Sequence, residues 1–588
     1  MDKELAVTRT DADADIHTPT ANEAYSDDTE TETDIDIDTD SHTLDHPNSL
    51  ELSRIETYRL QQKTTVGSTR GPQPRETWLP MGAGKEYPPL LPDPGVFVVE
   101  YDSAGDPMHP YNWSLTRRFV LWTWTWPWLG LANEFYRILL VTILSYSTFA
   151  NSFTSAVFSA AIGAVSSEFH ISREAASLGV TLFVLGFAAG PIAWAPMSEV
   201  IGRRWPVCIG AFGCGVFTIA CATAKDVQTI MLTRFFAGLF AAGPLSVVPA
   251  VFADLFAPAQ RGIVMSLFCM AVFIGPFAAP FVGGFVAMTL GWRWIMYISA
   301  IMVFLGFVLV ALWMEETYAP VILVHKAAVL RRQTHNWGIH AKQDEVEVAF
   351  VELVRNNFMR PLRMLVTEPI LLLVSLYISF VYGLMYALLG AYPVVFQEVY
   401  GMNMGVAGLA FIGLIIGELL GGVYILLLQS GYVRKLEAND NQPVPEWRLS
   451  PAIVGSVAFS SGLFWFGWCG YRPDIHWMAP VASGLLTGFG IFCIFLQCFN
   501  YIVDCYPTLA ASTIAANTIL RSGVGCAFPL FSRQMMENLG VQWAGTLLGC
   551  ISAAMIPIPV LFRMYGPWLR RKSTLACASY TKGTKGEV

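Results

Sequence analysis

The chain has 588 residues, of which 54% are hydrophobic and only 14% are charged, and its mean hydropathy is +0.47. Soluble domains carry about 25% charged residues, so this composition excludes an ordinary water-soluble fold. The net charge of −8 comes mostly from the first 75 residues and says little about the remainder.

Residues 1–75 are rich in Asp, Glu, Thr and Ser, as in "SDDTETETDIDIDTDSHT". They contain too few large apolar residues to bury a core, so we expect a disordered acidic tail, extending to residue 105. The chain does not open with a basic segment followed by an apolar one, so a cleavable signal peptide is not predicted. We therefore expect this tail to stay in the cytosol.

Between residues 137 and 563, apolar runs follow one another with short polar turns between them. About 20 apolar residues in a helix span a hydrocarbon core of about 30 Å, and a backbone in lipid must satisfy its own hydrogen bonds. The runs are continuous rather than alternating, which excludes a membrane β-barrel. We predict an all-α integral membrane protein whose twelve transmembrane helices lie at 137–161, 175–195, 205–223, 227–251, 262–287, 293–314, 367–393, 405–427, 450–470, 476–500, 510–533 and 541–563.

Lys and Arg are concentrated in alternate loops, and such loops face the cytosol. The basic loops contain Arg203, Arg204, Arg261, Arg434, Lys435, Arg448, a cluster between 315 and 366, and "LRRK" at 569–572. Both termini are therefore expected in the cytosol. We predict an N-terminal six-helix half (106–314), a basic cytosolic linker (315–366), a C-terminal six-helix half (367–563) and a cytosolic tail (564–588). The expected location is the plasma membrane, with the vacuolar membrane as the alternative.

The turn "APMSEVIGRR" at 195–204 places Glu199, Arg203 and Arg204 between the second and third spans. Secondary transporters are often built from two repeated halves with the substrate site between them. A charged turn at a helix junction can form ion pairs that exist in one transporter state and break in the other. The alternative is that the two arginines only set the topology.

Two ionisable residues fall inside spans, where such groups are costly and are functional candidates by default. Arg234 lies in span 4, and Glu418, in "LIIGELLGG", lies near the middle of span 8. A carboxyl group in a low dielectric can hold and release a proton near neutral pH, so Glu418 is the first candidate for a coupling proton. Arg234 could instead be an interhelical clamp. Glu418 could be a lipid- or core-facing carboxyl that stays permanently neutral, or one close enough to a helix end to be wetted. Glu368 and Asp504 lie at span ends, where we expect solvated anchors.

Polar and aromatic side chains within spans are candidates for lining a substrate cavity, with packing between helices as the alternative. Tyr382 and Tyr386 are four residues apart and therefore share a helix face. Arg521 could be a charge partner or a substrate contact. The full set of cavity candidates is Asn151, Ser155, Tyr382, Tyr386, Asn500, Asn517 and Arg521.

Other chemistries find no support in the sequence. A GxxxxGK[ST] loop is missing, so a Walker-type ATP site is not predicted, and neither HExxH nor CxxC spacing is present. The eleven cysteines are scattered, mostly inside spans, and fit small buried apolar residues. We predict no enzyme activity, no metal and no organic cofactor.

Several ordered motifs resemble a known family. "GPIAWAPMSEVIGRR" at 190–204 is similar to the signature loop of the major facilitator superfamily: Gly202, Arg203 and Arg204 match directly, and Glu199 stands for the usual Asp. "LTRFFAGLFAAGP" at 232–244 resembles the span-4 motif, with Arg234 as its embedded arginine.

"FIGPFAAPFVGG" at 273–284 resembles the span-5 motif of drug:proton antiporters, with matches at Gly275, Pro276, Gly283 and Gly284 and a departure at Ala279. Flanking segments, "DPMHPYNWS", "GWRW", "EETYAPVIL", "PEWRLSPA" and "NYIVDCYPTLAASTIAANTILRS", narrow the resemblance to the fungal twelve-span drug:proton antiporters. That branch includes polyamine exporters and efflux pumps for secondary metabolites.

This resemblance implies export of a small organic compound, such as a fungal secondary metabolite, toxin or drug, driven by the proton gradient without a cofactor. A polyamine:proton antiporter is the alternative, and a non-transporting membrane sensor is a remote one. The resemblance also implies that spans 1, 4, 7 and 10 line the cavity and that Arg234 takes part in proton coupling. The expected partners are the small-molecule substrate, protons and the lipid bilayer. We expect a monomer and no nucleic acid.

The segment "LWTWTWPWLGLANEFYRI" at 121–138 is extra relative to the family. Its Trp-rich part is too short to span a bilayer. It could lie in the membrane interface, where Trp is favoured, or it could be an unspliced intron translated in the gene sequence.

Overall fold

The computed structural model describes residues 98–101, 132–256, 258–334, 338–345, 350–439, 444–506 and 509–573. Most of the acidic tail, residues 121–131 of the Trp-rich segment and the end of the C-terminal tail lie outside these residues. Residues 132–138 form the first turns of helix α3, where the Tyr136 hydroxyl donates a hydrogen bond to the Trp313 carbonyl at 2.9 Å.

Twelve helical segments of the described chain are long and apolar enough to cross a membrane, and each overlaps a predicted span. The predicted all-α fold class is therefore confirmed. In the first half the spans are α3 (Ala132–Val157) continued by η5 (Phe158–Ala161) and α4 (Ile162–Glu168), then α5 (Arg173–Val200), α6 (Arg204–Ala222), α7 (Val227–Leu255), α8 (Pro258–Thr289) and α9 (Trp292–Trp313).

The second half repeats this plan with more interrupted helices. Its spans are α12 (Pro369–Pro393) with η7 (Val394–Val399), α13 (Met404–Leu409) with α14 (Ile412–Glu437), η8 (Pro445–Arg448) with α15 (Leu449–Cys469), α16 (Met478–Cys505), α17 (Ala510–Gly525) with α18 (Phe528–Leu539), and α19 (Val541–Met555) with α20 (Pro557–Lys572). The final helix thus extends eight residues beyond the predicted start of the C-terminal tail, residue 564.

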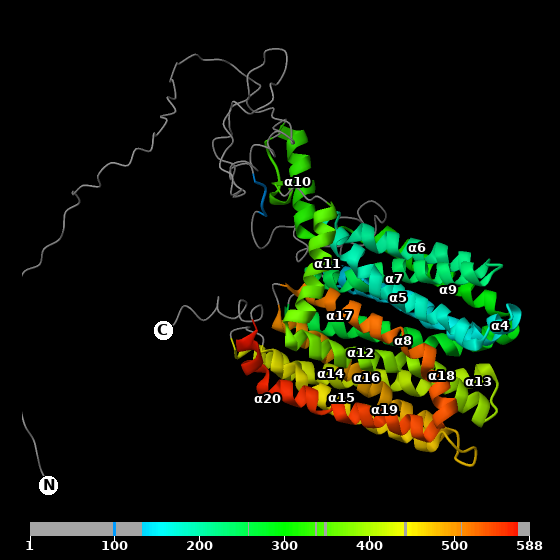
Figure 1. Cartoon of the computed structure of the whole chain (residues 1–588). Helices are drawn as coiled ribbons and strands as arrows, with labels where there is room; N and C mark the ends of the chain where they lie inside the picture. Colours follow the sequence, from blue (N-terminus) through cyan, green and yellow to red (C-terminus); the bar gives the residue numbers. More distant parts are fainter. Residues whose placement is uncertain are drawn as a thin grey trace, which may run out of the picture. The chain divides into compact units, whose positions relative to one another are not determined.

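The linker between the halves carries α10 (Ala319–Thr334), η6 (Lys342–Glu345) and α11 (Phe350–Thr367). Residues 98–101 join it, because the Val99 amide donates to the His340 carbonyl at 2.9 Å and its side chain packs with Ala327 and Ala341. These four residues thus differ from the disorder that composition predicts for the tail. We call the end of the helices that carries α10 and α11 the linker end (Figure 1).

Glycines let the helices of each half pack closely in the same way. In the first half α5 packs on α7, and a Cβ on Gly238 would lie only 2.1 Å from the Phe183 carbonyl oxygen. In the second half α14 packs on α16, and a Cβ on Gly488 would lie 2.1 Å from the Leu414 carbonyl oxygen. Spans 2 and 4 and spans 8 and 10 therefore meet by equivalent contacts.

The two halves meet along two helix pairs. Helix α5 packs on α17 and α18, and α8 packs on α13 and α14. The span-5 motif lies on the second of these contacts: a Cβ on Gly284 would lie 2.7 Å from the Met404 carbonyl oxygen. Gly275 and Gly283 instead face α3 and η5, where added Cβ atoms would lie 2.8 Å from the Phe153 nitrogen and 3.0 Å from the Ala160 Cβ. Pro276 is buried within α8 between them.

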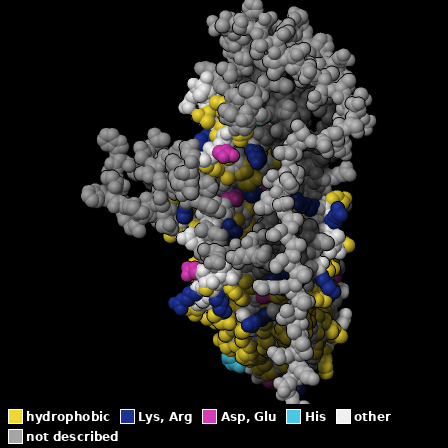
Figure 2. Space-filling view, turned by 90° about the vertical axis from the view of Figure 1, so that its left-hand side faces the viewer, with side chains coloured by type: hydrophobic (Ala, Val, Ile, Leu, Met, Phe, Trp, Pro, Cys, Tyr) yellow, Lys and Arg dark blue, Asp and Glu magenta, His cyan; other side chains and the backbone are white. Residues whose placement is uncertain are grey.

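Basic side chains gather at the linker end. Figure 2 looks onto this end and shows Lys and Arg on its described surface, next to a mostly hydrophobic flank. The last turn of α20 contributes Arg570, Arg571 and Lys572. This is the arrangement from which the sequence predicts a cytosolic face.

Candidate functional site

The turn between α5 and α6 is built around one glycine and one carboxylate. Gly202 has a φ of +99°, a conformation that side chains other than glycine rarely adopt. The amides of Arg203 and Arg204 donate to the two carboxylate oxygens of Glu316 at 2.7 and 3.2 Å. A Cβ on Gly202 would lie 2.2 Å from that carboxylate, so only glycine fits between the turn and Glu316.

The Arg203 side chain ties the turn to span 4. Its Nε lies 3.1 Å from the Asp254 carboxylate, and its Nη1 donates to the Ser198 hydroxyl at 2.7 Å. The guanidinium also stacks 4.6 Å from the centre of the Tyr318 ring, and burial raises the pKa of that phenol. Arg204 donates to the Ala311 carbonyl at 2.9 Å. The turn therefore links spans 2, 3, 4 and 6 within the first half.

Glu199 faces the second half instead. Together with Pro361 of α11 and Ala515 of α17 it lines a small cavity at the linker end. Its carboxylate forms no ion pair with a described residue, whereas its backbone carbonyl accepts a hydrogen bond from Gln343 at 3.1 Å. The predicted switching of this turn between transporter states stays a prediction.

Arg234 is only 1% exposed, and its charge is satisfied by carbonyl oxygens. The guanidinium donates to Gly179 at 2.9 Å, Thr154 at 2.9 Å and Ser155 at 2.8 Å. Thr154 and Ser155 lie in the last turn of α3, directly before the helix tightens into η5. The side chain also stacks on Phe183 at 4.3 Å. Arg234 has the geometry of an interhelical clamp between spans 1, 2 and 4; its part in proton coupling stays a prediction.

Glu418 is fully buried, and within the described residues neither carboxylate oxygen has a hydrogen-bond partner. Its helical neighbours show where it lies. A Cβ on Gly417 would approach the Leu485 carbonyl of α16 to 2.3 Å, and one on Gly422 would approach Met270 of α8 to 2.8 Å. Glu418 therefore lies where span 8 meets spans 5 and 10. The alternatives of a lipid-facing or a wetted carboxyl are wrong for this structure.

A set of buried polar and aromatic side chains joins the two halves at mid-span. The Ser155 and Tyr386 hydroxyls are 2.8 Å apart. Ser155 also donates to the Ser152 carbonyl at 2.6 Å, and a serine hydroxyl has a single proton, so Tyr386 is the donor to Ser155. This hydrogen bond connects span 1 with span 7.

Aromatic rings surround this hydrogen bond. The rings of Tyr382 and Tyr386 are 5.2 Å apart, that of Phe273 lies 4.5 Å from Phe495, and Arg521 stacks 4.5 Å from the Tyr382 ring. We call Ser155, Phe273, Tyr382, Tyr386, Phe495 and Arg521 the central cluster. It brings together four of the seven cavity candidates, and Phe273 and Phe495 are members that the sequence did not single out.

The other three candidates differ in position. Asn151 lies one helical turn before Ser155 and donates to the Ser147 carbonyl at 2.7 Å. Asn517 lies one turn before Arg521; it is fully buried, and neither atom of its amide has a partner among the described residues. Asn500 is half-buried towards the linker end of α16 and lies outside the cluster.

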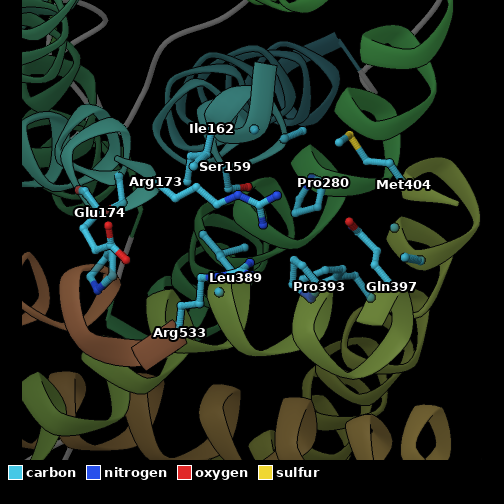
Figure 3. Close-up of a pocket in the computed structure, with 18 of the residues that line it drawn as sticks. Ser159, Ile162, Arg173, Glu174, Pro280, Leu389, Pro393, Gln397, Met404 and Arg533 are labelled. Carbon is cyan, nitrogen blue, oxygen red and sulfur yellow. The ribbon is translucent and has the colours of Figure 1, made fainter. Parts of the chain in front are cut away.

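A cavity of about 170 Å³ lies beyond the central cluster, on the side away from the linker end. It is lined by both halves, including Ser159 and Gly390, each four residues further along than Ser155 and Tyr386. Figure 3 shows Arg173 reaching across it, with Arg533 and Leu389 on the facing side. Glu398 binds both arginines: Arg173 of the first half at 3.9 Å and Arg533 of the second. This network could not be predicted from local sequence, because its members are distant in the chain.

The linker end holds two carboxylates that the sequence predicted to be solvated. For Glu368 this is wrong: it is fully buried and accepts hydrogen bonds from the Tyr506 hydroxyl, at 2.9 Å, and from the Ser573 hydroxyl. Burial and the adjacent Glu368 carboxylate raise the pKa of the Tyr506 phenol, so Tyr506 stays a neutral donor. Asp504 is a partly buried ion-pair partner of Arg448 at 2.7 Å. The C-terminal end of α20 contacts this region through Ser573, which local sequence does not reveal.

Twelve spans in two halves, with a buried polar cluster and a cavity between them, define a membrane transporter. The chain belongs to the Major Facilitator Superfamily, whose family model matches residues 144–529. The family and the relatives described next are transporters, so the prediction that the chain is not an enzyme is confirmed.

Three relatives of this chain are transporters from fungi. The multidrug transporter TPO1_2 of Candida glabrata is 43% identical over 84% of this chain and 83% of its own length. The multidrug transporter FLU1 of Candida albicans is 42% identical over 90% of this chain and 84% of its own length. The citrinin biosynthesis cluster transporter mrr1 of Monascus ruber is 40% identical over 81% of this chain and 92% of its own length. The predicted membership in the fungal drug-transporter branch of the superfamily is thereby confirmed.

The solved structures support the fold. The proton:xylose symporter XylE bound to 6-bromo-6-deoxy-D-glucose superposes with a TM-score of 0.53, covering 73% of this chain and 95% of its own at 17% identity.

Proposed function

We propose that this transporter is a proton-driven antiporter that exports a small organic compound, such as a fungal secondary metabolite, toxin or drug, across the plasma membrane. The names of its relatives support this: two are multidrug transporters and one belongs to a biosynthetic gene cluster. The proton gradient is the energy source, and the chain acts as a monomer without a cofactor. Both termini lie in the cytosol, because the linker end carries the basic residues.

The observation that best supports proton coupling is the buried carboxyl group of Glu418. Burying an isolated carboxylate costs far more than burying the neutral acid, and this side chain has no partner among the described residues. In this structure the Glu418 side chain is therefore most stable in its protonated, neutral form. A proton taken up from the outer side and released to the cytosol would drive the substrate in the opposite direction.

The contacts between the halves supply the alternating access. The Ser155–Tyr386 hydrogen bond closes the middle, Glu398 holds Arg173 and Arg533 together on the outer side, and Glu199 faces α17 on the cytosolic side. Each of these features lies between the two halves and must change when a substrate passes. Arg203 and Arg234, by contrast, bind within the first half and keep it rigid.

The test is efflux from cells that express the chain, with and without a proton uncoupler, for a panel of aromatic polyketides and spermidine. We expect uncoupler-sensitive efflux of at least one polyketide. Glu418→Gln, which cannot release a proton, should abolish that efflux while the protein still reaches the membrane. The matched control is Glu437→Gln, which changes an exposed carboxylate at the end of the same helix and should leave efflux unchanged.

Each alternative has its own outcome. Efflux of spermidine alone would favour the polyamine antiporter, and efflux that survives both the uncoupler and Glu418→Gln would refute proton coupling at this residue. Absence of any flux would favour a membrane sensor. A fluorescent N-terminal fusion would show whether the protein lies in the plasma membrane or in the vacuolar membrane.

A further inference from the structure

The two arginines buried at mid-span differ in how their charge is satisfied. Arg234 is 1% exposed and donates to three carbonyl oxygens at 2.8–2.9 Å. Arg521 is 5% exposed, and its guanidinium forms neither a hydrogen bond nor an ion pair with any described residue; its Nε is completely enclosed. The second half therefore holds a buried cation whose hydrogen-bond donors are unused.

An unused buried guanidinium is costly. The desolvation cost of a buried charge must be offset by a charged partner or by hydrogen bonds. An ionisable residue inside a membrane therefore marks a functional site by default. Glu418 does not fill the role, because neither of its oxygens bonds to any described side chain. A ligand that enters during the transport cycle would supply the missing acceptors.

The surroundings of Arg521 are aromatic. Its guanidinium stacks 4.5 Å from the Tyr382 ring and 5.0 Å from the Phe495 ring. Phe273, from the first half, lies against both rings, at 6.5 and 4.5 Å. Rings of this kind offset-stack with planar aromatic molecules, and the planar guanidinium fork binds a carboxylate through two parallel hydrogen bonds.

Asn517 adds a second set of unused polar atoms. It precedes Arg521 by one turn of α17, so the two side chains share a helix face. Its amide is fully buried, and neither its oxygen nor its nitrogen has a partner among the described residues. A buried amide without partners costs free energy, which a ligand hydroxyl or carbonyl beside the charged group would recover.

We propose that Arg521, Asn517 and the rings of Tyr382 and Phe495 form the substrate site for an aromatic organic anion, whose carboxylate or phenolate binds Arg521 while its ring stacks on the aromatic side chains. The proposal rests on the export function proposed above and gives it a substrate class. It disfavours polyamines, because a buried cation repels ammonium groups. Tyr386, which joins span 7 to Ser155, lies beside the site, so separating the halves there opens it towards the 170 Å³ cavity.

The test measures binding, so that it does not depend on proton coupling. The purified full chain is held at fixed pH in lipid nanodiscs without a gradient, and its thermal stabilisation by a ligand gives the affinity. The probes are three acids, each with its neutral amide: 1-naphthoate and 1-naphthamide, cinnamate and cinnamamide, salicylate and salicylamide. We expect at least one acid to bind about ten- to hundredfold more tightly than its amide, the ratio carried by a hydrogen bond to a charged group.

Arg521→Met should remove that preference and leave the affinity for the amide within about twofold. The matched control is Arg472→Met, which changes an exposed arginine that also stacks on a tyrosine, Tyr471 at 5.0 Å, and should keep the preference. Arg521→Lys, which keeps the charge without the fork, should retain only part of it.

Equal affinity for acid and amide in all three pairs of the unaltered protein would overturn the proposal, and so would tight binding of spermidine at this pH. If Arg521→Met does not fold, the difference in affinity between acid and amide in the unaltered protein tests the proposal by itself. Glu418→Gln should bind the acid normally. Efflux that survives both the uncoupler and Glu418→Gln would refute the proposed coupling and leave this site standing, because acid binding is measured without a gradient.

Discussion

At the scale of single residues, the turn at 195–204 depends on a carboxylate more than a hundred residues away. Glu316 accepts hydrogen bonds from the amides of Arg203 and Arg204 and also from those of Thr317 and Tyr318. The family signature names the glycine and the arginines, whereas the residue that fixes the turn lies in "EETYAPVIL". Glycine is therefore required at position 202 for two reasons: its left-handed backbone conformation and its close contact with the Glu316 carboxylate.

We predict that Gly202→Ala destabilises the protein by about 1–2 kcal/mol from the left-handed backbone alone, with more from the clash with Glu316. Thermal unfolding of the purified protein measures this. The control is Gly431→Ala, a helical glycine with open space around its added Cβ, which should not destabilise the protein. Equal melting temperatures for the two variants would mean that the turn tolerates a side chain.

The residue scale also shows what local sequence can and cannot give. The burial of Glu418 follows from its place in an apolar run, and the neighbourhood of Tyr382 and Tyr386 follows from their spacing. Asp254, Glu316 and Glu398 were missed, because a carboxylate at a span end looks solvated until the partner from another span is known. Glu368 shows the same limit, since Tyr506 and Ser573 reach it only in the folded chain.

At the scale of elements, the twelve spans were predictable because each must present about 20 apolar residues to lipid. The breaks inside them were not. The change from α3 to η5 at Phe158 falls within a continuous apolar run, so the sequence does not show it. It lies directly after the carbonyls that bind Arg234. The span-5 motif likewise reads as a run of small residues, whereas only the structure divides it between contacts to span 1 and to span 8.

We predict that Gly284→Ala blocks transport while leaving the protein folded. Its Cβ would lie 2.7 Å from the Met404 carbonyl oxygen across the contact between the halves, and the packing within each half would be unchanged. Efflux together with monodisperse size-exclusion behaviour tests this. Gly523→Ala, the same substitution in span 11 with nothing within 4 Å of the Cβ, is the control. Normal efflux by Gly284→Ala would show that this contact does not govern the cycle.

At the scale of the whole molecule, the two halves are joined on the side away from the linker end by a shared carboxylate. Glu398 pairs with Arg173 across the halves and with Arg533 within the second half, whereas Glu537 pairs with Arg533 along one helix. The side chains of Arg173 and Glu398 are 55% and 41% exposed, so each pair contributes at most about 1 kcal/mol.

We predict that Glu398→Gln raises, by up to about fivefold, the rate at which a membrane-impermeant thiol reagent, added outside the cell, labels a cysteine placed at Ser159 in the 170 Å³ cavity. The background is Cys550→Ser, because Cys550 is an exposed cysteine. Glu537→Gln, which removes a pair that does not cross the halves, should leave the rate unchanged. Equal rates in the two variants would mean that Glu398 does not hold the two halves together at this cavity.

The end of the last helix has a practical consequence for anyone who engineers this chain. Ser573 donates to the buried Glu368 at the start of span 7, and Arg570 binds both oxygens of Glu446 at 3.0 Å. A truncation before Ser573 would uncap a carboxylate inside the protein, whereas reporters and purification tags joined after Val588 leave these contacts in place. The end of the last helix therefore holds buried carboxylates of the transport core, and deletions that remove it would register as defects of that core.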